Sequence, residues 1–294
     1  MWPIHLDLGF RVFYFYEGFY FLVAIATASW LAFGRFQKAG LDALGLVEDL
    51  PWTLLGAVFG ARVFHFLFWD PHAFLADPIS FFRIWEGGVS ITGGLAGGVL
   101  TALFRFRRRN VDFWHAFAVA SPAVLIGQAI GRVGCFLNGD AWGIPTSLPW
   151  GVAEPRFGMV LPMMVRDHHV ASAAWLWCVQ RGYSSAVSLA TVPLHPTQLY
   201  EALGDLLLAG AMVALGRRLG RTDGPWRGVF WGHLGGYAFL RFGLEFLHGD
   251  RDGTVWMGMT ALQLGLLAFA LLSGVMLARW PGPVVHRKPG PLEP

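Results

Sequence analysis

Long apolar stretches alternate with short, charged connections along most of this chain of 294 residues. Seven of the stretches approach the roughly 20 mainly apolar residues that a helix needs to cross the hydrocarbon core of a bilayer. We predict membrane spans at Phe13–Phe33, Pro51–Trp69, Gly87–Phe104, Phe113–Cys135, Thr197–Gly216, Gly228–Leu247 and Val255–Leu277. The pattern therefore predicts an all-α polytopic membrane protein with seven transmembrane helices.

Arginine and lysine gather in every other connection between these spans. They follow the first, third and seventh spans and fill the connection between the fifth and sixth. Because cytoplasmic loops carry an excess of positive residues, we expect the N-terminus outside and the C-terminal tail, residues 280–294, in the cytoplasm. The first span lacks a preceding basic segment and a following cleavage site, so we expect no removable signal peptide.

The longest connection, about residues 143–193, falls on the outer side in this arrangement. Its prolines and mixed polarity predict short elements that pack on the bundle rather than an eighth span. We therefore expect one integral-membrane domain over residues 1–294, with a small extracytoplasmic cap between spans four and five.

The composition excludes a soluble globular protein. Of the residues, 55% are hydrophobic and 14% are charged, whereas a soluble domain carries roughly 25% charged residues. The net charge of +3 reflects basic residues distributed by topology, so we expect no nucleic-acid partner. The two cysteines, Cys135 and Cys178, are too few for a disulfide scaffold, and no spacing predicts a metal site.

Three arginines, Arg62, Arg132 and Arg241, lie within or at the ends of predicted spans. An ionisable group at membrane depth is costly and by default marks a functional site. Arg241 and Glu245 are four residues apart, on one helix face, and are expected to pair. Because several spans contribute the charges, we favour a cavity that holds an anion; structural ion pairs are the alternative.

Three segments add polar groups to this interpretation. Asn138, Gly139 and Asp140 form a tight, polar turn after the fourth span. Residues 195–201 supply polar side chains at the outer start of the fifth span, where an ordinary helix entry is the alternative. In the glycine-rich residues 85–98, helix packing accounts for Gly97 and Gly98, while the glycines around Thr92 favour a ligand.

Taken in order, these motifs resemble the bacterial prolipoprotein diacylglyceryl transferases over nearly the whole chain. The main signature is Gly131-Arg132-Val133-Gly134-Cys135-Phe136-Leu137-Asn138-Gly139-Asp140 with Trp142-Gly143. The supporting matches are Gly60-Ala61-Arg62, Asp77-Pro78, Trp85-Glu86-Gly87-Gly88, Gly93-Gly94, His195-Pro196-Thr197-Gln198-Leu199-Tyr200-Glu201, Arg241-Phe242 and Glu245-Phe246.

The resemblance implies an enzyme of the bacterial inner membrane that needs no metal or organic cofactor. Its substrates would be phosphatidylglycerol, the lipid donor, and the lipobox cysteine of a prolipoprotein signal peptide, the acceptor. Forming the thioether releases glycerol 1-phosphate. Elementary chemistry agrees: cationic groups promote thiolate formation, and arginine neutralises the charge that develops on a leaving phosphate.

The resemblance also assigns roles to individual residues. Arg132 resembles the arginine that binds the headgroup phosphate, and Arg241 resembles the essential arginine of the sixth span. We assign substrate binding to a further set that lines or supports the same site: Asn138, Gly139, Asp140, Thr92, His195, Gln198, Glu201, Tyr237 and Glu245.

Two positions depart from the family pattern. Many members carry a histidine, a natural general base, where this chain has Thr92, and a tyrosine where it has Glu17. We therefore include Glu17 among the catalytic candidates. The same departures leave an alternative, a transferase-like paralogue that binds anionic phospholipid without transfer. A transporter is disfavoured because the two halves show no internal repeat.

Overall fold

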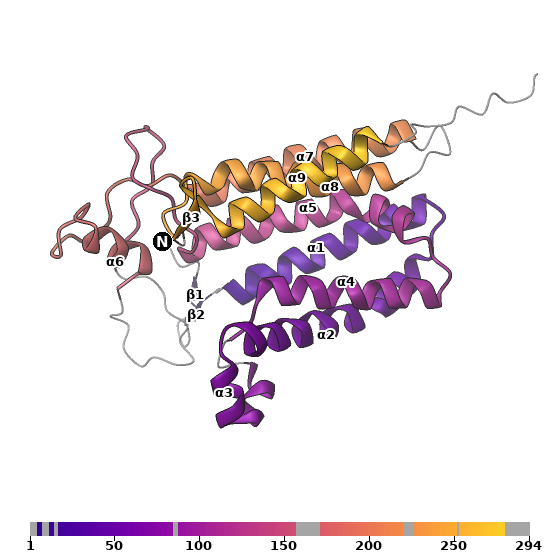
Figure 1. Ribbon diagram of the computed structural model, residues 1–294, viewed down its shortest axis with the longest axis horizontal. Helices are drawn as coiled ribbons and strands as arrows, with labels where there is room; N and C mark the ends of the chain where they lie inside the picture. Colours follow the sequence, from indigo (N-terminus) through magenta and orange to yellow (C-terminus); the bar gives the residue numbers. More distant parts are fainter. Residues whose placement is uncertain are drawn as a thin grey trace, which may run out of the picture. The chain divides into compact units, whose positions relative to one another are not determined.

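A computed structural model gives the structure of the chain and describes residues 5–7, 12–14, 17–84, 88–156, 171–219, 226–251 and 253–279. Within these ranges the chain is mainly helical (Figure 1). The long helices are α1 (Glu17–Lys38), α2 (Ala43–Phe68), α4 (Ile91–Arg108), α5 (Phe113–Asn138), α7 (Thr197–Leu219), α8 (Arg227–Glu245) and α9 (Ala261–Ala278).

Short elements connect the long helices. The short helices are α3 (Pro71–Ala76), η1 (Pro78–Phe82) and α6 (Ala173–Gln180). Two antiparallel ribbons pair β1 (His5–Asp7) with β2 (Val12–Tyr14), and β3 (Thr254–Trp256) with β4 (Met259–Thr260). These ribbons are a small departure from the predicted all-α class.

Each predicted span overlaps one long helix, and five of these helices are long and apolar enough to cross a membrane. The five are α1, α2, α5, α7 and α9. The two others are more polar: α4 ends in three arginines of its last four residues, and α8 contains Arg241 and Glu245. The chain is thus a mostly helical membrane protein with several spans.

Capping residues explain where the helices differ from the predicted spans. The helix α2 begins earlier than predicted because the Asp42 side chain accepts a hydrogen bond from Gly45 N at 2.8 Å. The helix α9 begins later than predicted because Thr260 and Gln263 form a capping box. Residues before this box pair as β3 and β4 instead of extending the helix. Similarly, residues 12–14 belong to β2, so the first helix starts after them.

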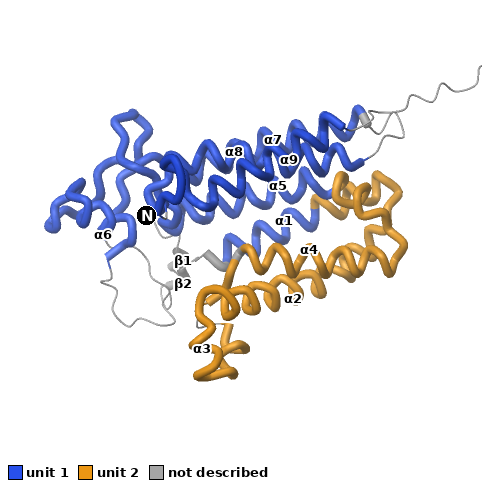
Figure 2. The backbone as a smooth tube through the Cα atoms, in the orientation of Figure 1, with its two compact units in different colours: residues 1–30, 120–294 blue, residues 31–119 orange. Residues whose placement is uncertain are grey.

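The chain divides into two compact units, residues 1–30 with 120–294 (unit 1) and residues 31–119 (unit 2), coloured separately in Figure 2. The boundaries fall within α1 and α5, so each of these helices contributes to both units. The single domain that we predict for residues 1–294 stays a prediction.

In unit 2, α2 and α4 lie side by side because glycines remove side chains from their interface (Figure 1). A Cβ atom on Gly97 would lie 2.2 Å from the Gly56 carbonyl oxygen, and one on Gly93 would lie 2.4 Å from that of Gly60. Small residues four apart on both helices allow this close approach. Packing against α2 therefore accounts for Gly93, one of the glycines around Thr92 that we took to favour a ligand.

An ion cluster joins α2 and α4 at the end where α4 finishes. Asp49 is buried and accepts hydrogen bonds from Arg105 Nε at 2.7 Å and from Arg109 Nε at 3.0 Å. Arg109 also contacts Glu48 at 2.6 Å and Asp42 at 3.3 Å. The cluster satisfies a carboxylate that would be costly to bury alone.

In unit 1, α8 packs against both α7 and α9. Glycines again mark the contacts: Gly204 of α7 faces Leu240, and Gly235 of α8 faces Ser273. The helix α5 meets the first part of α1 at Gly134, where a Cβ atom would lie 2.5 Å from that of Tyr20. This contact gives a packing reason for a glycine of the main signature.

The described parts of the connection between α5 and α7, residues 139–156 and 171–196, fold as short elements. Isolated bridges join Val152 to Leu194 and Pro155 to Ala190. Ala174 and Cys178 of α6 are fully buried and form a small core with Leu194. Over the described part of this connection, α6 is the one helix, as the prediction of short elements requires.

Candidate functional site

A single buried carboxylate, that of Glu201 on α7, joins residues from three helices. Arg132 Nη2 on α5 lies 2.9 Å from Glu201 Oε1, and the Tyr237 hydroxyl on α8 donates to the same oxygen at 3.1 Å. Arg241 Nε on α8 lies 3.9 Å from Glu201 Oε2. The structure thus brings together two arginines that are more than a hundred residues apart in the sequence.

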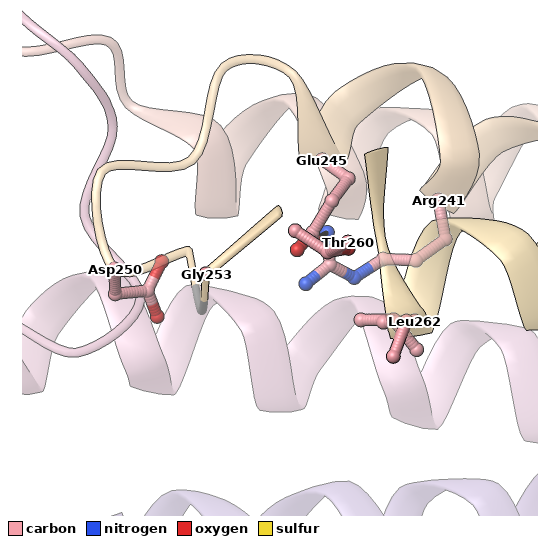
Figure 3. A pocket seen from close by; sticks show the side chains of 7 residues that line it. Arg241, Glu245, Asp250, Gly253, Thr260 and Leu262 are labelled. Atoms are coloured by element: carbon pink, nitrogen blue, oxygen red, sulfur yellow. Dashed lines mark ion pairs between the residues drawn. The ribbon is translucent and has the colours of Figure 1, made fainter. Parts of the chain in front are cut away.

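The predicted Arg241–Glu245 pair is confirmed, with Nη1 and Oε2 separated by 2.5 Å. Both residues line a cavity of about 230 Å³ (Figure 3). Its walls are Arg241, Glu245, Asp250, Gly253, Thr260, Ala261 and Leu262. The Arg241 side chain reaches from α8 toward Glu245 and Thr260, and Asp250 lies on the other side of the cavity.

Asp205 is a polar residue of this region that the sequence analysis missed. It follows Glu201 by four residues on α7 and is fully buried. Neither of its carboxyl oxygens has a hydrogen-bond partner among the residues that the structure describes. The signal was present in the sequence, because a carboxylate at this spacing lies on the same helix face as Glu201.

The polar turn after α5 is held by the start of α7. Gly139 adopts φ +87°, a conformation that favours glycine, and Asn138 Nδ2 donates to Asp140 Oδ2 at 2.5 Å. Gln198 Nε2 donates to the Asp140 carbonyl at 2.6 Å, and Thr197 Oγ1 donates to that of Ala141 at 2.8 Å. Two motifs that we predicted separately therefore meet, and Gln198 supports the backbone of the turn.

His195 faces Tyr200 rather than the arginines. Its Nδ1 lies 3.3 Å from the Tyr200 hydroxyl, which also accepts a hydrogen bond from Trp150 Nε1 at 2.8 Å. Its main chain packs against Gly143, where a Cβ atom would lie 2.3 Å from the His195 carbonyl oxygen. The last glycine of the main signature is thus required by this close approach.

Glu154, which the sequence analysis also missed, lies beneath the polar turn. Its side chain is buried, and a Cβ atom on Gly139 would lie 3.6 Å from its Oε2. Burial raises the pKa of Glu154 to about 7, and the charge of Asp140 adds to this rise. Burial likewise raises the pKa of the neighbouring Cys178 to about 11. Both cysteines of the chain are free thiols.

Arg62, the third arginine, binds backbone in unit 2. Its guanidinium donates to the carbonyls of Phe81 at 2.9 Å and of Gly88 at 2.8 Å, and also to that of Ser80. These bonds tie Arg62 of α2 to η1 and to Gly88, which lies before α4. These partners of Arg62 are backbone carbonyls, which neither the predicted anion cavity nor the alternative of structural ion pairs anticipated.

The two departures from the family pattern lie elsewhere in the chain. Thr92 is in the first turn of α4, with an exposed side chain, in unit 2. Glu17 is the first residue of α1, and its side chain lies outside the described residues. Among the described residues, no group of three or more His, Cys, Asp or Glu side chains is arranged to hold a metal ion.

Comparison with known proteins agrees with the motifs. The family model described as prolipoprotein diacylglyceryl transferase matches residues 3–279. A phosphatidylglycerol–prolipoprotein diacylglyceryl transferase of Polynucleobacter necessarius is 32% identical over 270 residues, which cover 90% of this chain and 88% of that protein. A protein of the same name from Geobacter sulfurreducens is 31% identical over 283 residues, which cover 94% of this chain and 89% of that protein.

Proposed function

We propose that this chain, which belongs to the prolipoprotein diacylglyceryl transferase family, transfers a diacylglyceryl group from phosphatidylglycerol to a prolipoprotein. The acceptor in this proposal is the thiol of the lipobox cysteine, and the released product is glycerol 1-phosphate. Membership of the family and the names of the relatives support both substrates.

The observation that carries the proposal is the convergence of Arg132 and Arg241 on Glu201. Each guanidinium has five N–H donors, and the described partners of the two arginines engage only part of them. The remaining donors suit phosphate oxygens, which arginine binds in a bidentate manner. Glu201 orients both cations and offsets the cost of burying them.

In the proposed reaction, Arg132 holds the phosphate of phosphatidylglycerol and Arg241 faces the bond that breaks. The acceptor thiolate attacks the diacylglyceryl carbon, a C–S bond forms, and the C–O bond to phosphate breaks. Arg241 then neutralises the charge that develops on the leaving phosphate, an interaction that strengthens as the reaction proceeds.

The other predicted site residues support this arrangement in two ways. Tyr237 and Glu245 keep the two arginines in place through Glu201 and through Arg241. The turn residues Asn138, Gly139 and Asp140, held by Gln198, shape the same end of α5. The direct substrate contacts that we assign to these residues, and to His195 and Thr92, remain part of the proposal, and Glu17 stays among the catalytic candidates.

The same proposal includes the arrangement in the membrane. We assign seven spans to α1, α2, α4, α5, α7, α8 and α9 in the bacterial inner membrane, with the N-terminus outside and the C-terminus in the cytoplasm. The residues between α5 and α7 then form the extracytoplasmic cap, and 1–294 form one functional domain. The alternating basic connections support this orientation.

Replacement of either arginine by alanine tests the function. We expect Arg132→Ala and Arg241→Ala to lower transfer to a lipobox peptide by at least about 100-fold, since loss of one donor to a developing charge has this effect. The measurement is mass spectrometry of the thioether product, with each variant present in the membrane at the parent level. Arg218→Ala, an exposed residue at the end of α7, is the matched control.

The same assay separates the alternative function. If the parent chain binds phosphatidylglycerol vesicles but forms no thioether product with any lipobox peptide, the chain is a lipid-binding paralogue. Full transfer by either arginine variant would contradict the proposed site.

A further inference from the structure

A histidine–carboxylate pair follows α8 and borders the cavity that Arg241 lines. His248 Nδ1 lies 2.9 Å from Asp250 Oδ1. The His248 side chain is 1% exposed and that of Asp250 is 37% exposed. Asp250 therefore presents its carboxylate to the cavity, across from Arg241 (Figure 3), whereas His248 is not among the residues that line the cavity.

The backbone fixes this pair against the segment that follows the polar turn. Gly143 and His248 form an antiparallel bridge, and Gly249 N donates to the Trp142 carbonyl at 2.8 Å. A Cβ atom on Gly249 would lie 2.9 Å from the Gly143 carbonyl oxygen, so the two segments are in close contact. His248 is thus held rigidly, as a group that positions another side chain must be.

One route connects the imidazole with the cavity. His248 Nε2 is buried and has no hydrogen-bond partner among the described residues, whereas Nδ1 contacts Asp250. A proton can therefore pass between the cavity and the ring through the Asp250 carboxylate. Imidazole holds a proton near neutral pH, which a carboxylate alone does less well.

The proposed transfer needs such a route, because a thiol must lose its proton before it attacks. Thr92 cannot accept this proton, because a threonine hydroxyl is not a base near neutral pH. We propose that Asp250 accepts the proton of the acceptor thiol and that His248 holds this proton during the transfer. Asp250 is then a catalytic residue, and His248 is a positioning residue that acts through it.

The steps balance without a further reactant. The thiol S–H bond breaks, Asp250 takes the proton and passes it to His248 Nδ1. The thiolate forms the C–S bond, and the C–O electron pair leaves with the phosphate. The proton then returns through Asp250 to the leaving phosphate oxygen. This inference rests on the proposed function, because it supplies the base for that reaction.

Other charged groups near the pair set its environment. Arg241 and Glu245 of α8 line the same cavity, and Arg251 follows Asp250 and donates to the Gly258 carbonyl at 3.0 Å. The flanking segments 142–144 and 260–262 contain no ionisable side chain.

Asp250→Asn and His248→Gln test the proposal in the full-length protein. With phosphatidylglycerol in detergent micelles and a lipobox cysteine peptide, we expect kcat to fall about 100-fold, the scale of general base catalysis. The KM for the lipid should stay unchanged, because Arg132 and Arg241 remain. His233→Gln is the control, since His233 is another buried histidine, bonded to Ser121 Oγ at 2.7 Å, and should keep the parent kcat.

A peptide with selenocysteine in place of the acceptor cysteine distinguishes a proton role from a structural one. A selenol is already ionised at neutral pH and needs no base, so both variants should regain transfer to within about tenfold of the parent. Arg132→Ala should gain nothing from this peptide.

Several outcomes would overturn the inference. These are a parent-like kcat for Asp250→Asn, a loss confined to KM, or no rescue by the selenocysteine peptide. Asp250 is partly exposed, so its variant keeps the test decisive if His248→Gln does not fold. An inactive parent chain would instead contradict the proposed function itself, which separates the two failures.

Discussion

Glu154 shows how one buried residue makes the stability of this protein depend on pH. Its pKa is raised from about 4.5 to about 7, mainly because burial disfavours the charged form. At a pH between these two pKa values, the folded chain binds more protons than the unfolded chain. The relative stabilisation is therefore complete below about pH 4.5 and is lost as the pH rises through 7.

We predict that Glu154→Gln removes this dependence. A shift from about 4.5 to about 7 corresponds to about 3 kcal/mol. The variant should therefore gain stability over the parent by up to that amount as the pH rises from 5 to 8. Thermal unfolding of the detergent-solubilised parent and variant at pH 5 and pH 8 measures this gain in stability.

Asp70→Asn is the control for this prediction. Asp70 is exposed and caps α3, a role that asparagine also fills. Its effect should be the same at pH 5 and pH 8. If the difference in stability between the parent and Glu154→Gln does not grow from pH 5 to pH 8, the raised pKa of Glu154 is contradicted.

At the scale of elements, glycines decide how close the helices come. In α4, a Cβ atom on Gly97 would meet the backbone of α2. On Gly94, one turn away, it would lie 3.5 Å from its nearest neighbour, the Ala57 carbonyl oxygen. The two positions share a helix and a residue type but differ in available space. This difference allows packing to be tested apart from helix propensity.

We predict that Gly97→Ala destabilises the protein by about 1–3 kcal/mol, because the added methyl group overpacks the interface. Gly94→Ala should leave stability unchanged or slightly raised, since alanine is the better helix former. Unfolding temperatures of the two variants in detergent provide the measurement. Equal effects would mean that Gly97 is not a close-packing position.

At the scale of the whole molecule, the orientation in the membrane is the property that most constrains function. In our assignment the proposed site meets a prolipoprotein on the outer side, and the basic connections lie in the cytoplasm. Val187, between α6 and α7, and Arg108, at the end of α4, are both exposed and lie on opposite sides in our assignment.

We predict that Val187→Cys reacts with a membrane-impermeant maleimide in intact spheroplasts. Arg108→Cys should react only after lysis. Both variants are made in a chain whose Cys135 and Cys178 are replaced by alanine, and that chain without an added cysteine is the control. The reverse labelling pattern would overturn the assigned orientation.

The sequence alone determined the class of the protein and the order of its long helices. Apolar stretches and basic connections act locally, so they are readable without tertiary contacts, and the motif order already pointed to the family. The Arg241–Glu245 pair was predictable for the same reason, because four residues on a helix make neighbours.

Only the tertiary structure decided which distant residues meet. Arg132 and Arg241 share Glu201 because α5, α7 and α8 pack together, and no spacing in the sequence encodes that contact. The folded structure likewise packs Gly93 against α2, bonds Arg62 to backbone carbonyls, and pairs His248 with Asp250. Partners of buried polar groups are selected by desolvation and packing across helices, and these act only once the chain has folded.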